Sequence, residues 1–274
     1  YSTYFDNNGN IKSGKLKSGD VLDFSGNFNK LTFKINIPLT ITSTDGTAQL
    51  TNCNFLITNG AQGTNVSNLK ANTDKLETAI FNVSDVSRVS IINNTLFANA
   101  TGSYPILFNG VNESKILNNI ARTTAYVKGW GHPSVIVLSN SFYNNISSNN
   151  VITNDSNGIY LTGYLGGGEM GQEGGANAYN YIFNNTVHSI RGVEWALDSN
   201  GKVPLPSSFA YGIQVMGAYN DIINNTVYNM YRGISGTQTG NKVIGNTLYN
   251  IHGTWYSGNT NDEGGDYAIY TSKN

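Results

Sequence analysis

Short apolar runs alternate with asparagine- and glycine-rich corners along most of the chain. The clearest runs are NYIFNNTVHSI (180–190), NDIINNTVYNM (220–230) and NKVIGNTLYNI (241–251), and each places Asn-Thr between two apolar stretches. Within each run, apolar and polar residues alternate with a period of two, which predicts a short strand with one buried face. The pattern therefore predicts a succession of short β-strands joined by tight corners.

The runs recur with a measurable period. Asn225 and Asn246 are 21 residues apart, and the same alignment places Asn150 and Asn185 on preceding repeats, with longer spacings explained by insertions. A unit of about 21 residues with three short strands predicts one coil of an all-β, single-stranded parallel β-helix. Leucine-rich repeats have a similar period, but they need a leucine signature and a helical segment that this sequence lacks.

The alignment also predicts what each column of residues does. Asparagine tolerates the left-handed backbone conformation that a tight corner needs, and stacked asparagine amides can hydrogen-bond to one another. An inward aliphatic stack is expected from Ile152, Val187, Val227 and Leu248. A second tight corner is expected at Gly158, Gly192, Gly212 and Gly233.

The segment IPLTITSTDGTAQLTNCNF (37–55), the NNT(V/L) coils and the strands GIYLTG and GIQVMG carry a family resemblance. They resemble the right-handed parallel β-helix repeats of large adhesin-like surface proteins of methanogenic archaea. The resemblance spans roughly residues 20–274. It implies a secreted, extracellular protein of the cell surface, and a segment of a longer polypeptide.

The two ends of the chain suggest a domain organisation. Residues 1–30, with the turn-like FDNNGN and LKSGD, are expected to form an N-terminal cap, and residues 31–274 the β-helix domain. The final segment DYAIYTSKN (266–274) predicts another inward-facing strand. Because an uncapped coil exposes an adhesive edge, we expect the β-helix to continue beyond the given chain.

Composition narrows the functional classes. Charged residues make up 12% of the chain and the net charge is −1, so the composition does not indicate a basic surface that would bind nucleic acid. No apolar run is long enough to span a membrane, and no leader is seen, so any secretion signal is expected to have been removed. The single cysteine, Cys53, cannot form an internal disulfide and is expected to be buried.

Functional residues are expected in the segments that interrupt the repeat. Residues 163–179 and 193–211 are inserted at nearly the same point of adjacent coils, which predicts that they lie side by side as a lip or cleft. Residues 125–137 and 252–267 also depart from the pattern. These departures contain the candidate ligand-binding residues Trp130, His132, Trp195, Trp255 and Tyr256. Aromatic rings beside polar groups are typical of carbohydrate sites, although each tryptophan could instead pack its own loop.

Catalytic chemistry is an alternative. A glycosidase needs two carboxylates at a defined separation, and a lyase or epimerase needs a base with a cation that stabilises the intermediate. The candidates are Glu169, Glu173, Glu194, Asp198 and Arg191. Their spacing is not diagnostic, and they could equally be solvated loop charges.

No cofactor is expected, apart from a weak calcium candidate. The run NDEGGD (261–266) offers oxygen ligands from Asp262, Glu263 and Asp266. The histidines are isolated from one another. His188 aligns with Tyr228 and Tyr249, which predicts an outward-facing aromatic stack rather than a metal ligand.

Possible glycan acceptors are Asn93, Asn184 and Asn224, each within an Asn-x-Thr triplet. Composition alone produces about as many such triplets as the sequence contains, so their number is not evidence for glycosylation. Three functional hypotheses remain open: an adhesin-like module that binds glycans or surface proteins of another cell, a polysaccharide lyase, hydrolase or epimerase, and a structural spacer.

Overall fold

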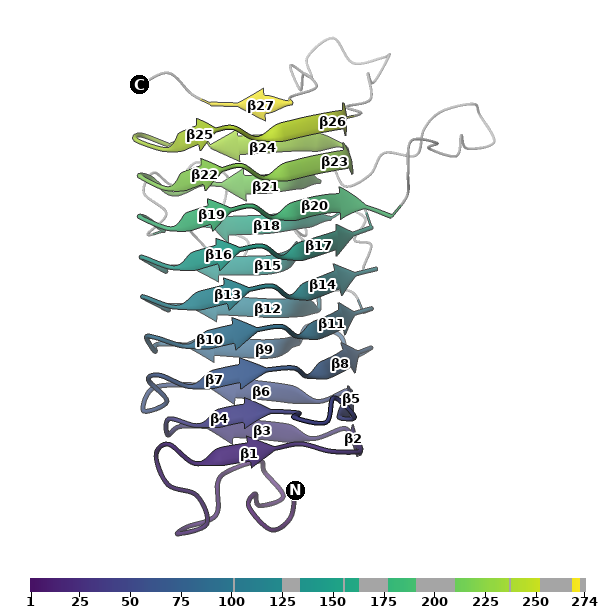
Figure 1. The fold of residues 1–274 in the computed structure, drawn as a ribbon, viewed down its shortest axis with the longest axis vertical. Helices are drawn as coiled ribbons and strands as arrows, with labels where there is room; N and C mark the ends of the chain where they lie inside the picture. The colour runs from purple at the N-terminus through teal and green to yellow at the C-terminus, as the bar shows by residue number, and fades with distance from the viewer. Residues whose placement is uncertain are drawn as a thin grey trace, which may run out of the picture.

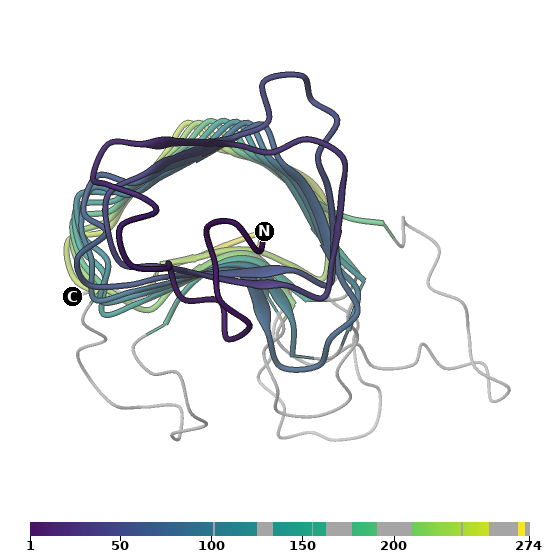
Figure 2. The same ribbon diagram turned by 90° about the horizontal axis from the view of Figure 1, so that it is seen from below.

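The computed structural model describes residues 1–100, 102–124, 134–154, 156–162, 177–190, 210–236, 238–251 and 268–271. In these residues the chain forms three parallel sheets of nine strands each and no helix. Successive strands go to successive sheets, so three strands complete one coil. The coils stack into a right-handed parallel β-helix (Figures 1 and 2), which confirms the predicted fold class.

The strands of each sheet follow one another along the helix axis. The first sheet contains β1 (Val21–Asp23), β4 (Thr40–Thr42), β7 (Asn65–Ser67), β10 (Ser90–Ile92), β13 (Lys115–Leu117), β16 (Asn145–Ser147), β19 (Tyr181–Phe183), β22 (Asp221–Ile223) and β25 (Lys242–Ile244). The second contains β2 (Asn27–Asn29), β5 (Gln49–Thr51), β8 (Lys70–Thr73), β11 (Thr95–Ala98), β14 (Ile120–Thr123), β17 (Asn150–Thr153), β20 (Thr186–Ser189), β23 (Thr226–Met230) and β26 (Thr247–Ile251). The third contains β3 (Thr32–Ile35), β6 (Asn54–Ile57), β9 (Ala79–Ser84), β12 (Tyr104–Asn109), β15 (Ser134–Ser139), β18 (Asn157–Thr162), β21 (Tyr211–Val215), β24 (Arg232–Gly236) and β27 (Ile269–Tyr270).

The interior is a set of aligned apolar columns. In the first sheet the register stacks β-branched residues that are all fully buried: Ile41, Val66, Ile91, Ile116, Ile146, Ile182 and Ile222. β-Branched side chains fit a pleated surface, which explains their use in these seven successive strands. Near the N-terminal end the filling is aromatic, with Phe33 and Phe55 stacked at 4.7 Å between ring centroids. The strands β1 and β2 fall within residues 1–30, so the sheets begin inside the segment predicted as a cap.

A ladder of buried asparagine side chains joins the coils at the corner between the first and second sheets. Asn185 shows the pattern: its Oδ1 accepts hydrogen bonds from Asn149 N and Nδ2, at 3.0 and 2.9 Å, and its Nδ2 donates to Asn225 Oδ1 at 2.9 Å. The ladder runs through Asn94, Asn119, Asn149, Asn185, Asn225 and Asn246. Its steps are 25, 30, 36, 40 and 21 residues, so among the coils that this ladder joins only the last has the predicted minimal length.

The ladder corrects three details of the predicted alignment. The ladder member just before β17 is Asn149 rather than Asn150, so Val151 faces inward and pairs with Val187 in the register. Ile152, predicted to face inward, pairs with outward-facing His188. The left-handed residue is the one before each ladder asparagine, such as Asn224 with φ of 55°.

The expected second glycine corner is also wrong for the described residues. Gly158, Gly212 and Gly233 lie within β18, β21 and β24, and none has a positive φ. Glycine is required at these positions because neighbouring residues approach the backbone closely. A Cβ at Gly158 would overlap Val187 of the second sheet. Gly192 lies outside the described residues.

Substituting Asn185 by alanine tests whether the ladder stabilises the fold. The change leaves the two buried donors of Asn149 without their acceptor, and we expect a loss of about 2–4 kcal/mol in the free energy of unfolding. Denaturant titration measures the loss. Asn184→Gly is the matched control, because Asn184 is exposed with φ of 55° and glycine adopts that conformation freely. Equal stability of the two variants would contradict a stabilising ladder.

Candidate functional site

The sequence-predicted site residues lie outside the described residues. These are the ligand-binding candidates Trp130, His132, Trp195, Trp255 and Tyr256, the catalytic candidates Glu169, Glu173, Glu194, Asp198 and Arg191, and the calcium candidates Asp262, Glu263 and Asp266. Their roles stay predictions. The structure does show where the segments that carry them join the β-helix.

The three tryptophan-bearing segments join at the same corner. Residues 125–133 connect β14 to β15, residues 191–209 connect β20 to β21, and residues 252–267 connect β26 to β27. Each of these connections runs from the second sheet to the third. Residues 163–176 instead connect β18 to β19, at the corner between the third and first sheets. The expectation that 163–179 and 193–211 are inserted at one point of the cycle is therefore wrong, since they flank opposite ends of the third-sheet strands.

Buried polar side chains begin third-sheet strands at the corner that the tryptophan-bearing segments share: Asn157 in β18, Tyr211 in β21 and Arg232 in β24. Gln214 lies further along β21. We call Asn157, Tyr211, Gln214 and Arg232 the corner cluster, and all four are buried. Arg232 Nη1 donates to the Tyr211 hydroxyl at 2.8 Å, and its guanidinium lies 5.1 Å from the centre of the Tyr211 ring. Asn157 Nδ2 donates to Gln214 Oε1 at 3.3 Å, and Asn157 Oδ1 accepts from Tyr211 N. The cluster offers amide, phenol and guanidinium groups, the set that hydrogen-bonds sugar hydroxyls.

The described strands of the third sheet carry no carboxylate, since none of them contains Asp or Glu. A glycosidase needs a pair of carboxylates on either side of the scissile bond. Such a pair would have to come from residues outside the described strands of this sheet. The described residues also contain no group of three or more His, Cys, Asp or Glu that could hold a metal ion.

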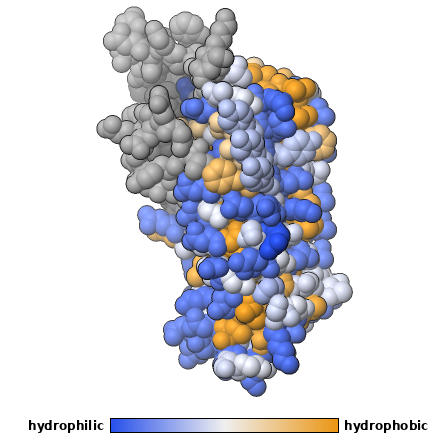
Figure 3. Space-filling view, turned by 90° about the vertical axis from the view of Figure 1, so that its left-hand side faces the viewer, coloured by the Kyte–Doolittle hydropathy of each residue, from blue (hydrophilic) through white to orange (hydrophobic). Residues whose placement is uncertain are grey.

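A column of exposed tyrosines, not anticipated from the sequence, lies at the corner between the third and first sheets. Tyr143, Tyr179 and Tyr219 form what we call the tyrosine ladder. Their rings are nearly parallel, with centroids 5.1 and 5.5 Å apart, and the residues are 60%, 50% and 51% exposed. Figure 3 faces this corner, which is the left-hand edge of Figure 1. The sequence carried a signal, because each tyrosine is followed by asparagine immediately before a first-sheet strand.

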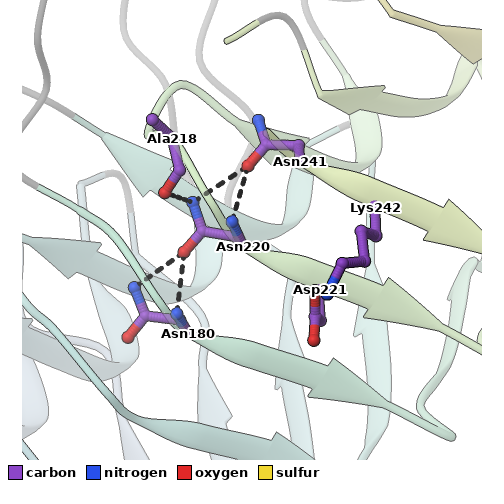
Figure 4. A network of polar contacts seen from close by, with 6 residues as sticks. All are labelled: Asn180, Ala218, Asn220, Asp221, Asn241 and Lys242. Carbon is purple, nitrogen blue, oxygen red and sulfur yellow. Dashed lines mark hydrogen bonds and ion pairs between the residues drawn. The ribbon is translucent and has the colours of Figure 1, made fainter. Parts of the chain in front are cut away.

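Those asparagines form a second buried ladder beneath the tyrosines (Figure 4). Asn180 Nδ2 donates to Asn220 Oδ1 at 3.0 Å, and Asn220 Nδ2 donates to Asn241 Oδ1 at 3.2 Å and to the Ala218 carbonyl at 3.0 Å. Asn144 continues the ladder downward to Asn180 at 3.0 Å. The backbone that carries each tyrosine is therefore fixed from below by hydrogen bonds between coils.

The predicted aromatic stack on the second sheet is confirmed. His188 lies 4.7 Å from Tyr228 and Tyr228 lies 4.8 Å from Tyr249, measured between ring centroids of nearly parallel rings. Burial lowers the pKa of His188, because the stack and the coils shield its charged form from water.

The possible glycan acceptors are accessible. Asn93, Asn184 and Asn224 are exposed and have φ of 57°, 55° and 55° at the corner between the first and second sheets. Attachment of a glycan there stays a prediction. Cys53 is buried, as expected, and burial raises the pKa of its thiol. Among the described residues there is no helix with the length and hydropathy of a membrane span.

Comparisons with known proteins give distant structural matches. No protein-family model matches the chain, and no curated relative matches it. The chain is similar to the receptor-binding tailspike of bacteriophage Det7, at 13% identity and TM-score 0.39, over 85% of this chain and 61% of the tailspike. It is also similar to the catalytic domain of a GH87 alpha-1,3-glucanase in complex with tetrasaccharides, at 12% identity and TM-score 0.33, over 92% and 62% of the two chains.

A further match is a glycoside hydrolase, at 10% identity and TM-score 0.31, over 81% of this chain and 51% of that one. The chain thus spans less than two thirds of the length of the structures it matches. At these scores the matches decide neither fold nor function. The resemblance to archaeal adhesin-like proteins stays a prediction.

The aromatic stack predicts how stability depends on pH. The pKa of His188 is lower in the folded chain than the usual value of about 6.5, so the unfolded chain binds the proton more readily. The free energy of unfolding should therefore fall as the pH drops below about 6.5 towards the folded-state pKa. The His188→Tyr variant, which extends the stack of Tyr228 and Tyr249, should lose this component of the pH dependence.

Histidine NMR titration together with denaturant unfolding at several pH values measures both quantities. A His188 imidazole that titrates at or above the usual histidine value would contradict this account of the stack.

Proposed function

We propose that the chain is a non-enzymatic, extracellular β-helix module of an adhesin-like surface protein, and that it binds glycans of another cell. One observation carries the proposal: the three tryptophan-bearing segments join the β-helix at one corner, where the buried corner cluster also lies. Repeated attachment at one corner means that the tryptophan-bearing segments of separate coils leave the scaffold at the same point of the coil. Loops carried on a rigid scaffold are a common place for binding residues.

The chemistry of that corner suits a neutral or weakly charged sugar. Tryptophan rings pack against the apolar faces of sugar rings, and amide, phenol and guanidinium groups hydrogen-bond the hydroxyls. Arg232 is the charged member of the corner cluster, so an acidic sugar would find a cation there. The cell-surface location and membership of a longer polypeptide rest on the resemblance stated for the coils.

Substitution of Trp195 and Trp255 tests the proposal. On a glycan array and in titration with the glycans that bind, Trp195→Ala and Trp255→Ala should each weaken binding about tenfold or more, as expected for aromatic contact residues. Trp195→Phe and Trp255→Phe are matched controls that keep an aromatic face and should retain most of the affinity. Thermal unfolding of every variant shows whether the coils remain intact.

The other functional classes give different results in the same experiments. Incubation with acidic and neutral polysaccharides, followed by assays for new reducing ends and unsaturated ends, should detect no cleavage. New ends would contradict the non-enzymatic proposal and favour a hydrolase or lyase. Absence of both binding and cleavage would favour a structural spacer.

A further inference from the structure

The tyrosine ladder occupies a backbone position that disfavours tyrosine. Tyr143, Tyr179 and Tyr219 have φ of 58°, 58° and 55°, in the left-handed region. For a bulky residue this conformation costs about 1 kcal/mol or more. At the other left-handed corner the chain uses residues that tolerate it, such as Asn93, Asn184 and Asn224. The stability of the coil therefore does not explain why three successive exposed tyrosines occupy this position.

Packing alone does not supply that reason. Each tyrosine is at least half exposed, so much of each ring contacts solvent rather than the coil. The rings are stacked and nearly parallel, and their centroids are more than 5 Å apart. They are therefore offset, which leaves part of each face and the hydroxyl edge accessible. Mutual contact within the column also holds the rings in place, so binding would cost little additional side-chain entropy.

The repeat of the ladder indicates what would bind. Successive ring centroids are 5.1 and 5.5 Å apart, a spacing similar to the length that one pyranose unit adds to an extended polysaccharide. Identical groups at constant spacing suit a polymer of identical units. The nearest ion pair, Asp221 with Lys242 at 3.2 Å, is mutually compensated, so the corner offers no net charge from this pair. We propose that the tyrosine ladder binds an extended neutral glycan that lies parallel to the helix axis, with one sugar unit per coil.

The tyrosine ladder has defined ends, which limit the length of glycan that it can contact. Above Tyr219 the corner position is Gly240, with φ of 74°, and a Cβ there would overlap the Tyr219 ring. Below Tyr143 the same position holds Glu113 and then Arg88, by the register of this corner. Three tyrosines therefore define about three sugar units of contact.

The ladder is separate from the corner cluster and from the tryptophan-bearing segments, which join the other end of the third-sheet strands. Its binding can therefore succeed or fail independently of the proposed function. Titration of the whole chain with linear cello-oligosaccharides, from glucose to cellohexaose, tests the ladder directly. Affinity should increase with each added unit up to cellotriose and then change little. No binding of any member, or binding that is independent of length, would overturn the proposal.

Substitutions at Tyr179 separate ligand binding from structure. Tyr179→Asn removes the central ring and introduces the residue that other left-handed corners use, so we expect an unchanged or higher Tm and at least a tenfold loss of cello-oligosaccharide affinity. Tyr179→Phe keeps the ring and should retain most of the affinity. Tyr249→Asn, in the exposed stack on the second sheet, should leave this binding unchanged.

Two other outcomes of these experiments would overturn the proposal. A lower Tm for Tyr179→Asn with unchanged affinity would show that the ladder stabilises the coil and binds no glycan, which overturns the proposal. Equal loss of cello-oligosaccharide affinity in Tyr249→Asn and Tyr179→Asn would show that the binding is not specific to the tyrosine ladder, and would also overturn the proposal. If only Tyr179→Asn loses affinity for cello-oligosaccharides, the ladder proposal stands whatever the glycan array shows.

Discussion

Hydrogen bonds between buried asparagine amides of successive coils fix the register on which the rest of the structure depends. In the upper coils two such ladders bracket each strand of the first sheet. Asn180 precedes β19 and Asn185 follows it, and Asn220 and Asn225 stand in the same relation to β22. Because each amide both donates and accepts, a coil that slipped by one residue would leave several buried polar groups without partners. Register is thus specified by polar as well as apolar contacts.

A fixed register has two consequences for function. Coils of 30, 36 and 40 residues fit the same ladder as a coil of 21, because the extra residues are inserted at the corners between strands. The entropic cost of closing such a loop rises only slowly with its length. Side chains at equivalent positions also align into columns along the axis. The stack of His188, Tyr228 and Tyr249 and the tyrosine ladder are two such columns, on different parts of the surface.

Much of the fold could be predicted from the sequence, because the residues that set the coil have a distinctive spacing. The Asn-Thr triplets gave the repeat, the ladder and the stack at His188. The choice between Asn149 and Asn150 could not be made, since two adjacent asparagines are equivalent to pattern reasoning and both Val151 and Ile152 are apolar enough to face inward. The glycines at 158, 212 and 233 were misplaced because glycine serves close approach as well as tight turns.

The candidate site was harder to predict. Tyrosine is not expected in a left-handed corner, so the repeated Tyr-Asn pair did not predict a corner. The hydrogen bonds of the second asparagine ladder show that each pair lies at one. Which segments share a corner depends on the sheet that each strand joins, and this could not be read from spacing when insertions of different lengths intervene. The aromatic and acidic candidates on those segments, such as Trp195 and Glu173, lie outside the described residues.

The most direct test of the central claim is an NMR titration of the ring-labelled tyrosines with cellotriose. The claim is that the buried asparagine ladders align exposed tyrosines into one binding column. It predicts that the ring signals of Tyr143, Tyr179 and Tyr219 shift together with a single dissociation constant, while those of Tyr228 and Tyr249 on the second sheet do not move. Shifts confined to other tyrosines, or different dissociation constants for the three ladder rings, would contradict it.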